Sequence, residues 1–112
     1  MVTEIRLYKL KENTADKFYD VFSNQSLPMM KRWKINVVDY GFSLIDKYSF
    51  YLIRNYENIE QRKDCQAAFY ESDEWKNGPE TEIMQCIDTY NTTLIDNEQF
   101  IGKLNDKRTT NG

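Results

Sequence analysis

Residues 35–55 read INVVDYGFSLIDKYSFYLIRN, and this stretch decides the fold. Residues 35–45 and 47–55 are rich in β-branched and aromatic side chains, and the Asp46-Lys47 pair between them is typical of a short turn. The pattern predicts two strands joined as a β-hairpin. Because side chains alternate between the faces of a strand, apolar residues fall on both faces of each strand. A sheet that is apolar on both faces must be covered on both.

The two faces of the predicted hairpin differ little in polarity. On the first strand, Val38, Tyr40, Phe42 and Leu44 oppose Ile35, Val37 and Ile45; on the second, Phe50, Leu52, Arg54 and Tyr56 oppose Tyr51 and Ile53. Helices of the same chain can cover one face. We therefore expect a second copy of the chain to cover the other.

The N-terminal strand carries a polar triplet. The stretch TEIRLY places Glu4, Arg6 and Tyr8 on one face and Ile5 and Leu7 on the other. An acid, a base and a phenol on one face form either an ordinary solvated surface or the lining of a polar pocket. We interpret this face as the lining of an enclosed interior.

A first helical segment follows this strand. Residues 15–33 carry apolar side chains at three- and four-residue steps, which predicts an amphipathic helix capped by Asn13 or Thr14. Leu27-Pro28 predicts a kink or a break within it. The apolar stripe consists of Ala15, Phe18, Phe22, Met29 and Trp33.

Further helices follow the hairpin. Asn58 and Gln61 have the spacing of a weakened capping box, and Pro79 suits the first position of a third helix. The expected inner face is Ile59, Cys65, Ala68 and Phe69 in the second helix and Ile83, Met84, Ile87 and Tyr90 in the third. Residues 92–95 predict a short closing strand.

The order of elements predicts the β-α-β-β-α-β pattern of a ferredoxin-like α+β fold with a four-stranded antiparallel sheet. Its helices leave one face of the sheet bare, and pairing of two such faces would form a dimeric α+β barrel. We expect a single domain over residues 1–96 and a polar tail over 97–112, with Phe100 and Ile101 as its anchoring contact.

Composition excludes several function classes. The 112-residue chain has a net charge of −3 and scattered lysines and arginines, which argues against nucleic-acid binding. It contains neither a long apolar run nor a basic leader followed by an apolar segment, and Cys65 and Cys86 suit buried, reduced thiols, so we expect a cytoplasmic protein without a membrane span. The absence of histidine excludes Ser-His-Asp and Cys-His catalysis and argues against metal and haem sites.

Four short motifs carry a family resemblance over residues 3–95. EIRLYKLKEN, Leu27-Pro28, RNYENIEQR and SDEW resemble the NIPSNAP family, which belongs to the dimeric α+β barrel superfamily together with the antibiotic-biosynthesis monooxygenases. Glu4, Arg6 and Tyr8 match the opening strand of the family. Tyr56, Ile59, Arg62 and Trp75 match its later positions, whereas Asp39 replaces a usual glycine and Arg54 a usual aromatic residue.

The resemblance implies the architecture and a homodimer, but no specific reaction. In the barrel that it implies, Glu4, Arg6 and Tyr8 would line a chamber between the paired sheets. Tyr40, Arg54 and Tyr56 are the candidate ligand-binding residues that would join them there. We interpret Tyr56 and Trp75 primarily as packing residues, and Arg62 as a solvated charge or a member of a local salt bridge.

The polar triplet has three interpretations: a structural or interface role, ligand binding, and catalysis. The first functional hypothesis is a homodimeric module that binds a small apolar or anionic molecule, or a protein partner. The second resembles the cofactor-independent monooxygenases, which oxidise an electron-rich substrate without metal or prosthetic group. In that hypothesis Glu4 is the base if burial raises its pKa, Arg6 stabilises an enolate or phenolate, and Tyr8 orients the substrate.

Overall fold

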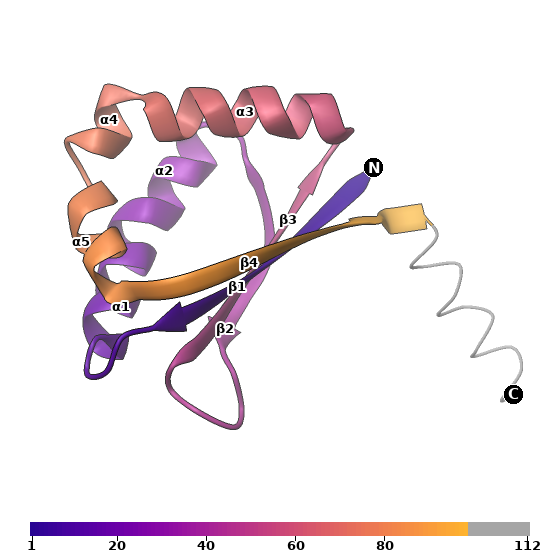
Figure 1. The fold of residues 1–112 in the computed structure, drawn as a ribbon. Coiled ribbons are helices and arrows are strands. Elements are labelled where there is room, and N and C mark those ends of the chain that lie inside the picture. The colour runs from indigo at the N-terminus through magenta and orange to yellow at the C-terminus, as the bar shows by residue number, and fades with distance from the viewer. Residues whose placement is uncertain (99–112) are drawn as a thin grey trace, which may run out of the picture.

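The sheet consists of β1 (Val2–Leu10), β2 (Asn36–Phe42), β3 (Ser49–Tyr56) and β4 (Ile87–Asp96). These strands are antiparallel and lie in the order β2-β3-β1-β4 (Figure 1). The computed structural model describes residues 1–98. In the two central strands, Glu4 of β1 lies opposite Arg54 of β3. The predicted ferredoxin-like α+β fold is confirmed.

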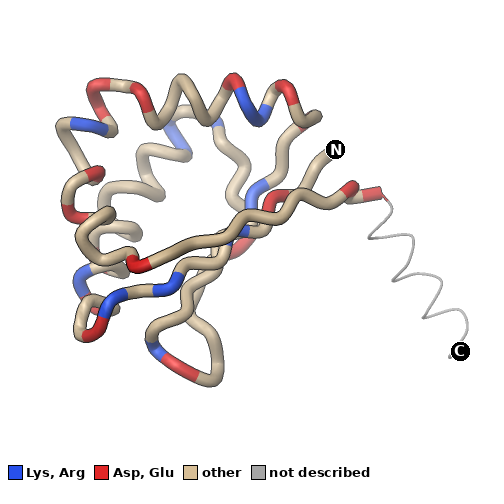
Figure 2. Tube along the Cα trace, in the orientation of Figure 1, with Lys and Arg blue, Asp and Glu red and all other residues tan. Residues whose placement is uncertain are grey.

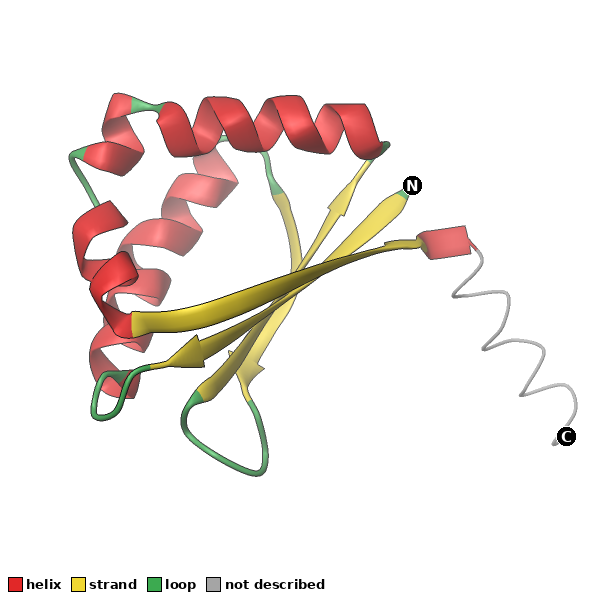
Figure 3. Ribbon diagram, viewed as in Figure 1, coloured by secondary structure: helices red, strands yellow, loops and turns green. Residues whose placement is uncertain are grey.

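The helices lie over one face of the sheet and leave the other face open (Figure 3). They are α1 (Ala15–Val21), the π-helical segment η1 (Phe22–Ser26), α2 (Leu27–Arg32), α3 (Ile59–Glu71), α4 (Asp73–Lys76) and α5 (Glu80–Cys86). Asn58 caps α3 by accepting a hydrogen bond from the backbone N–H of Gln61 at 2.7 Å, as the capping spacing predicts. The break predicted at Leu27-Pro28 corresponds to the π-helical segment that ends just before these residues.

The closing strand is longer than the sequence pattern predicts. The third helix was expected to continue through Ile87 and Tyr90, but α5 ends at Cys86 and both residues belong to β4. β4 pairs with β1 along the length of that strand, from Asp96 opposite Val2 to Ile87 opposite Leu10. This pairing makes β4 an edge strand of the sheet, and the helical spacing of Ile87 and Tyr90 was misleading.

The hairpin also differs from expectation, both within β2 and at its turn. A β-bulge lies between Val37 and Asp39, and such a bulge shifts the alternation of side chains by one residue. Val37 therefore packs against the core, while Val38 is 53% exposed. The strands stop short of the predicted turn, so that Leu44 and Ile45 lie exposed in the connecting loop.

One aromatic cluster packs helices on the sheet, and a second joins helical segments to one another. Phe50 of β3 lies at the centre of the first, with its ring centroid 5.0 Å from that of Phe18 and 5.3 Å from that of Phe22. Phe69 of α3 forms the second with Trp33, Tyr70 and Trp75 and joins α3 to α2 and α4. Ile59 and Ala68, which were expected on the inner face of α3, are exposed instead.

Helix α3 carries charged residues of both signs, as Figure 2 shows. None of the helices within residues 1–98 is long and apolar enough to cross a membrane. Phe100 and Ile101 lie outside the described residues, and the domain boundary at residue 96 stays a prediction.

Candidate functional site

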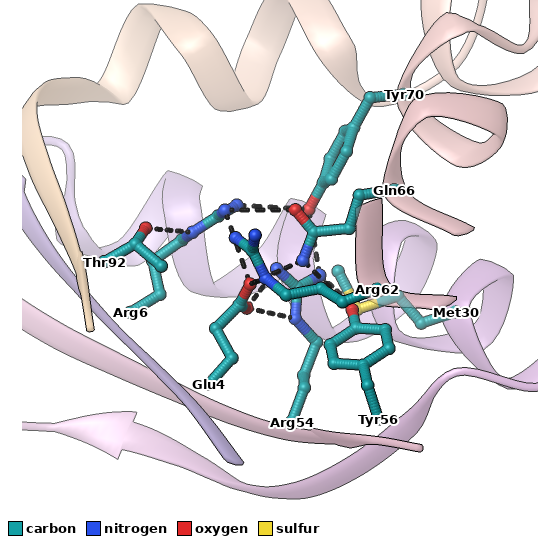
Figure 4. A network of polar contacts seen from close by, with 9 residues as sticks. All are labelled: Glu4, Arg6, Met30, Arg54, Tyr56, Arg62, Gln66, Tyr70 and Thr92. Atoms are coloured by element: carbon teal, nitrogen blue, oxygen red, sulfur yellow. Dashed lines mark hydrogen bonds and ion pairs between the residues drawn. The ribbon is translucent and has the colours of Figure 1, made fainter. Parts of the chain in front are cut away.

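Glu4 points toward the helices rather than toward the open face of the sheet. Its Oε2 atom accepts hydrogen bonds from Arg62 Nε at 2.6 Å and from Gln66 Nε2 at 2.5 Å, and both donors belong to α3 (Figure 4). The prediction that Glu4, Arg6 and Tyr8 line a chamber between paired sheets is therefore wrong. Their face is enclosed by helices of the same chain, since polar side chains of α3 bind Glu4 and Arg6 and the ring of Tyr8 packs against that of Phe18 in α1.

Arg54 binds the other oxygen of the same carboxylate. Its Nε and Nη2 atoms lie 2.8 and 2.6 Å from Glu4 Oε1, and its Nη1 atom donates to the Tyr70 hydroxyl at 3.0 Å. Neither Glu4 nor Arg54 has measurable exposure to solvent. Tyr56 joins the network by accepting a hydrogen bond from Gln66 Nε2 at 3.1 Å. Three elements of the fold, β1, β3 and α3, are thus linked by one buried polar network.

The network holds more positive than negative charge. Arg6, Arg54 and Arg62 all form ion pairs with the single carboxylate of Glu4. Burial favours the neutral acid, but the charges of Arg54 and Arg6 and the hydrogen bonds from Arg54 and Arg62 outweigh it and lower the pKa of Glu4. A carboxylate that acts as a general base near neutral pH needs a raised pKa instead. The geometry therefore argues against Glu4 as a proton acceptor.

Arg6 is the arginine of this network that also faces a cavity. Its Nε atom donates to Thr92 Oγ1 at 3.1 Å, its Nη2 atom to Gln66 Oε1 at 3.3 Å, and its Nη1 atom to the Tyr70 hydroxyl at 3.5 Å. Its nearest approach to Glu4 is 3.7 Å, much longer than the ion pairs of the other two arginines. Three hydrogen bonds thus position the Arg6 guanidinium, and its ion pair with Glu4 is the longest of the three.

The cavity lies between the sheet and the helices and has a volume of about 430 Å³. Arg6 and Tyr8 line it from the sheet, and burial, reinforced by the neighbouring Tyr70 hydroxyl, raises the pKa of Tyr8 to about 12. Its remaining lining is mostly apolar and aromatic and comprises Phe18, Phe22, Ser26, Met30, Gln66, Tyr70, Trp75, Lys76, Glu80, Ile83, Met84, Ile87 and Tyr90. An apolar chamber with a few polar groups is typical of small-ligand sites.

The structure brings most of the predicted site residues together, but not all. Glu4, Arg6, Arg54 and Tyr56 share the network, and Tyr8 lines the adjoining cavity. Tyr40 does not join them; its ring packs 5.3 Å from that of Phe22 in the aromatic core.

Three residues of α3 were missed or misjudged from the sequence. Arg62, interpreted as a solvated charge or local salt-bridge residue, binds Glu4 across the fold, and Gln66 and Tyr70 were not considered. These residues recur at four-residue steps and so form one stripe of the helix. That polar stripe was the signal available in the sequence.

Comparisons with known proteins agree with this architecture. The sequence model of the NIPSNAP family matches residues 3–99. A NIPSNAP family protein of unknown function from Agrobacterium tumefaciens, Atu4242, is similar with a TM-score of 0.78 and 21% identity, over 85% of this chain and 86% of that one. An uncharacterized NIPSNAP domain protein from Burkholderia xenovorans has a TM-score of 0.76 and 11% identity, over 86% and 93%.

A more distant likeness extends to another family of the same fold. The crystal structure of an antibiotic biosynthesis monooxygenase has a TM-score of 0.66 and 11% identity, over 86% of this chain and 97% of that one. No curated protein matches the chain by sequence. Since the family model covers nearly the whole chain, the protein belongs to the NIPSNAP family.

Proposed function

We propose that this protein binds a small, largely apolar organic anion in the cavity between its sheet and its helices. The observation that carries the proposal is the position of Arg6, which is 9% exposed, lines the cavity and comes no nearer to Glu4 than 3.7 Å. Aromatic and aliphatic side chains around it favour an apolar ligand body. A buried guanidinium in such surroundings attracts an anionic group strongly.

The alternative, a cofactor-independent monooxygenase, has support from the fold shared with the antibiotic biosynthesis monooxygenase. It requires a proton acceptor beside the substrate. Glu4 is the carboxylate of the network, and both of its oxygens already accept hydrogen bonds from cationic or amide groups. We therefore favour binding over oxidation.

The probe for the proposed ligand class is 2-naphthoate, an apolar two-ring carboxylate. Replacing Arg6 by glutamine is expected to weaken its binding about 10- to 100-fold, because one charge-assisted interaction is lost. Isothermal titration calorimetry measures the change. Arg32→Gln is the matched control, since the Arg32 side chain is 60% exposed and pairs with Glu74 away from the cavity. Equal affinities in the wild type and Arg6→Gln would contradict the proposal, provided that the variant keeps the wild-type circular dichroism spectrum.

We also propose that a second copy of the chain covers the open face of the sheet. This face carries Ile5, Leu7, Tyr51 and Ile53, which line a shallow groove, and Leu7 is 53% exposed. The sequence prediction of two equally apolar faces is right only in part, because Phe50 and its aromatic neighbours lie on the helical side. The remaining apolar side chains still favour burial against a like surface.

Sedimentation at micromolar concentration is expected to show a dimer of the wild type. Leu7→Asp should raise the dissociation constant at least about 100-fold, because each subunit would bury an unpaired carboxylate at the interface. Ile59→Asp is the control, since Ile59 is 62% exposed on the helical side. A monomeric wild type, or equal dissociation of the two variants, would count against the proposed interface.

A further inference from the structure

Ser26 is a buried polar residue in the wall of the cavity that lacks a hydrogen-bond partner. Its side chain is 1% exposed, and its Oγ atom has no partner among the described residues. Buried hydroxyl groups are nearly always hydrogen-bonded, and a helical serine can usually donate to the carbonyl four residues earlier. Ser23, one turn away, does so with the carbonyl of Tyr19 at 2.6 Å.

Both serines belong to the π-helical segment η1, but the hydroxyl of Ser26 does not bond the carbonyl four residues earlier. The carbonyl four residues before Ser26 belongs to Phe22, and it accepts the backbone N–H of Leu27, five residues along the chain. That carbonyl closes the wider turn and receives no bond from the Ser26 hydroxyl. Single π-helical turns inside α-helices occur frequently at functional sites. Ser26, a residue of the mostly apolar cavity wall, thus keeps a buried hydroxyl that is unpartnered within residues 1–98.

Arg6 and Ser26 approach the cavity from different layers of the fold. Arg6 belongs to β1 and Ser26 to η1, so one polar group comes from the sheet and the other from the helices. Much of the lining between them is apolar and includes the rings of Tyr8, Phe18 and Phe22. A ligand that satisfies both groups must carry two polar substituents on an apolar body.

We propose that Ser26 is a second polar anchor, which makes the ligand class a hydroxy- or oxo-substituted aromatic carboxylate. This inference rests on the proposed function, in which Arg6 holds the carboxylate. A serine hydroxyl both donates and accepts, so either a hydroxyl or a carbonyl group on the ligand satisfies it. The volume of about 430 Å³ suits a body of one or two rings.

The test compares 2-naphthoate with a series of hydroxy-2-naphthoates by isothermal titration calorimetry. At least one hydroxylated isomer is expected to bind the wild type about 3- to 10-fold more tightly than 2-naphthoate, the gain from one buried neutral hydrogen bond. Ser26→Ala should abolish this preference, so that the hydroxylated isomer and 2-naphthoate bind the variant with similar affinity. Ser23→Ala is the matched control and should preserve the preference.

The possible results separate this inference from the proposed function. If 2-naphthoate binds and depends on Arg6, but no isomer gains affinity through Ser26, the inference is overturned and the proposed function stands. If neither 2-naphthoate nor any hydroxylated isomer binds the wild type, both are overturned. The ligand-free Ser26→Ala variant should melt at or above the wild-type temperature, because it removes an unpaired buried hydroxyl. A clearly lower melting temperature would show that the hydroxyl has a structural partner, and would overturn the inference.

Discussion

Replacing Glu4 by glutamine is expected to reduce the free energy of unfolding by about 3–5 kcal/mol. Glutamine keeps the shape of the side chain but removes its charge, and so leaves Arg54 without a counter-ion at a site with no solvent exposure. Arg6 and Arg62 lose the same partner. Because small domains have a total stability of about 5–15 kcal/mol, this loss is a large fraction of it. Urea denaturation at pH 7 measures the change.

Glu74→Gln is the matched control for this experiment. Glu74 also pairs with an arginine, Arg32, at 3.3 Å, but the two side chains are 42% and 60% exposed. Ion pairs in such surroundings contribute less than about 1 kcal/mol. Similar costs for the two glutamine variants would mean that the buried network contributes little to stability.

The same carboxylate should make the protein sensitive to acid. Folding lowers the pKa of Glu4 below its ordinary value of 4.5, so the unfolded chain takes up a proton more readily than the native state. The stabilisation is therefore complete above the unfolded pKa and is lost as the pH falls through the lower native pKa. Below about pH 4.5, the stability of the wild type should fall more steeply with pH than that of Glu4→Gln.

The second large effect is expected at the aromatic cluster that holds α3 in place. Phe69→Ala should cost about 3–5 kcal/mol, because Phe69 is fully buried and its removal leaves a cavity between three rings. The ring centroids of Tyr70, Trp75 and Trp33 lie 4.8, 5.4 and 5.6 Å from that of Phe69. Tyr70 and Trp75 also line the cavity, so the variant should bind 2-naphthoate more weakly if the proposed function holds.

Ile59→Ala provides the comparison on the same helix. Ile59 is 62% exposed, and substitutions at such surface positions usually change stability by about 0.5 kcal/mol or less. Urea denaturation of both variants tests the difference. Comparable losses would show that the outward face of α3 is buried in solution, for instance by another molecule, and that Phe69 does not dominate the attachment of this helix.

Local sequence patterns predicted much of the fold because they depend on neighbouring residues alone. Asn58 caps α3 as expected, the helical segment breaks ahead of Pro28, and Phe50 and Leu52 share a buried face of β3. The limits of β4 were predicted less well. Its pairing with β1 depends on a strand more than 70 residues away, which no local periodicity records.

The sequence by itself determined that Glu4, Arg6 and Tyr8 share one face of a strand, because strand alternation is a local property of the backbone. Only the tertiary structure decided that this face lies beneath α3. Burial of three arginines around one carboxylate becomes favourable only when β3 and α3 bring their side chains within hydrogen-bonding distance. Arg54 and Arg62 lie 50 and 58 residues from Glu4 along the chain, so their effect on its charge could not be inferred from spacing.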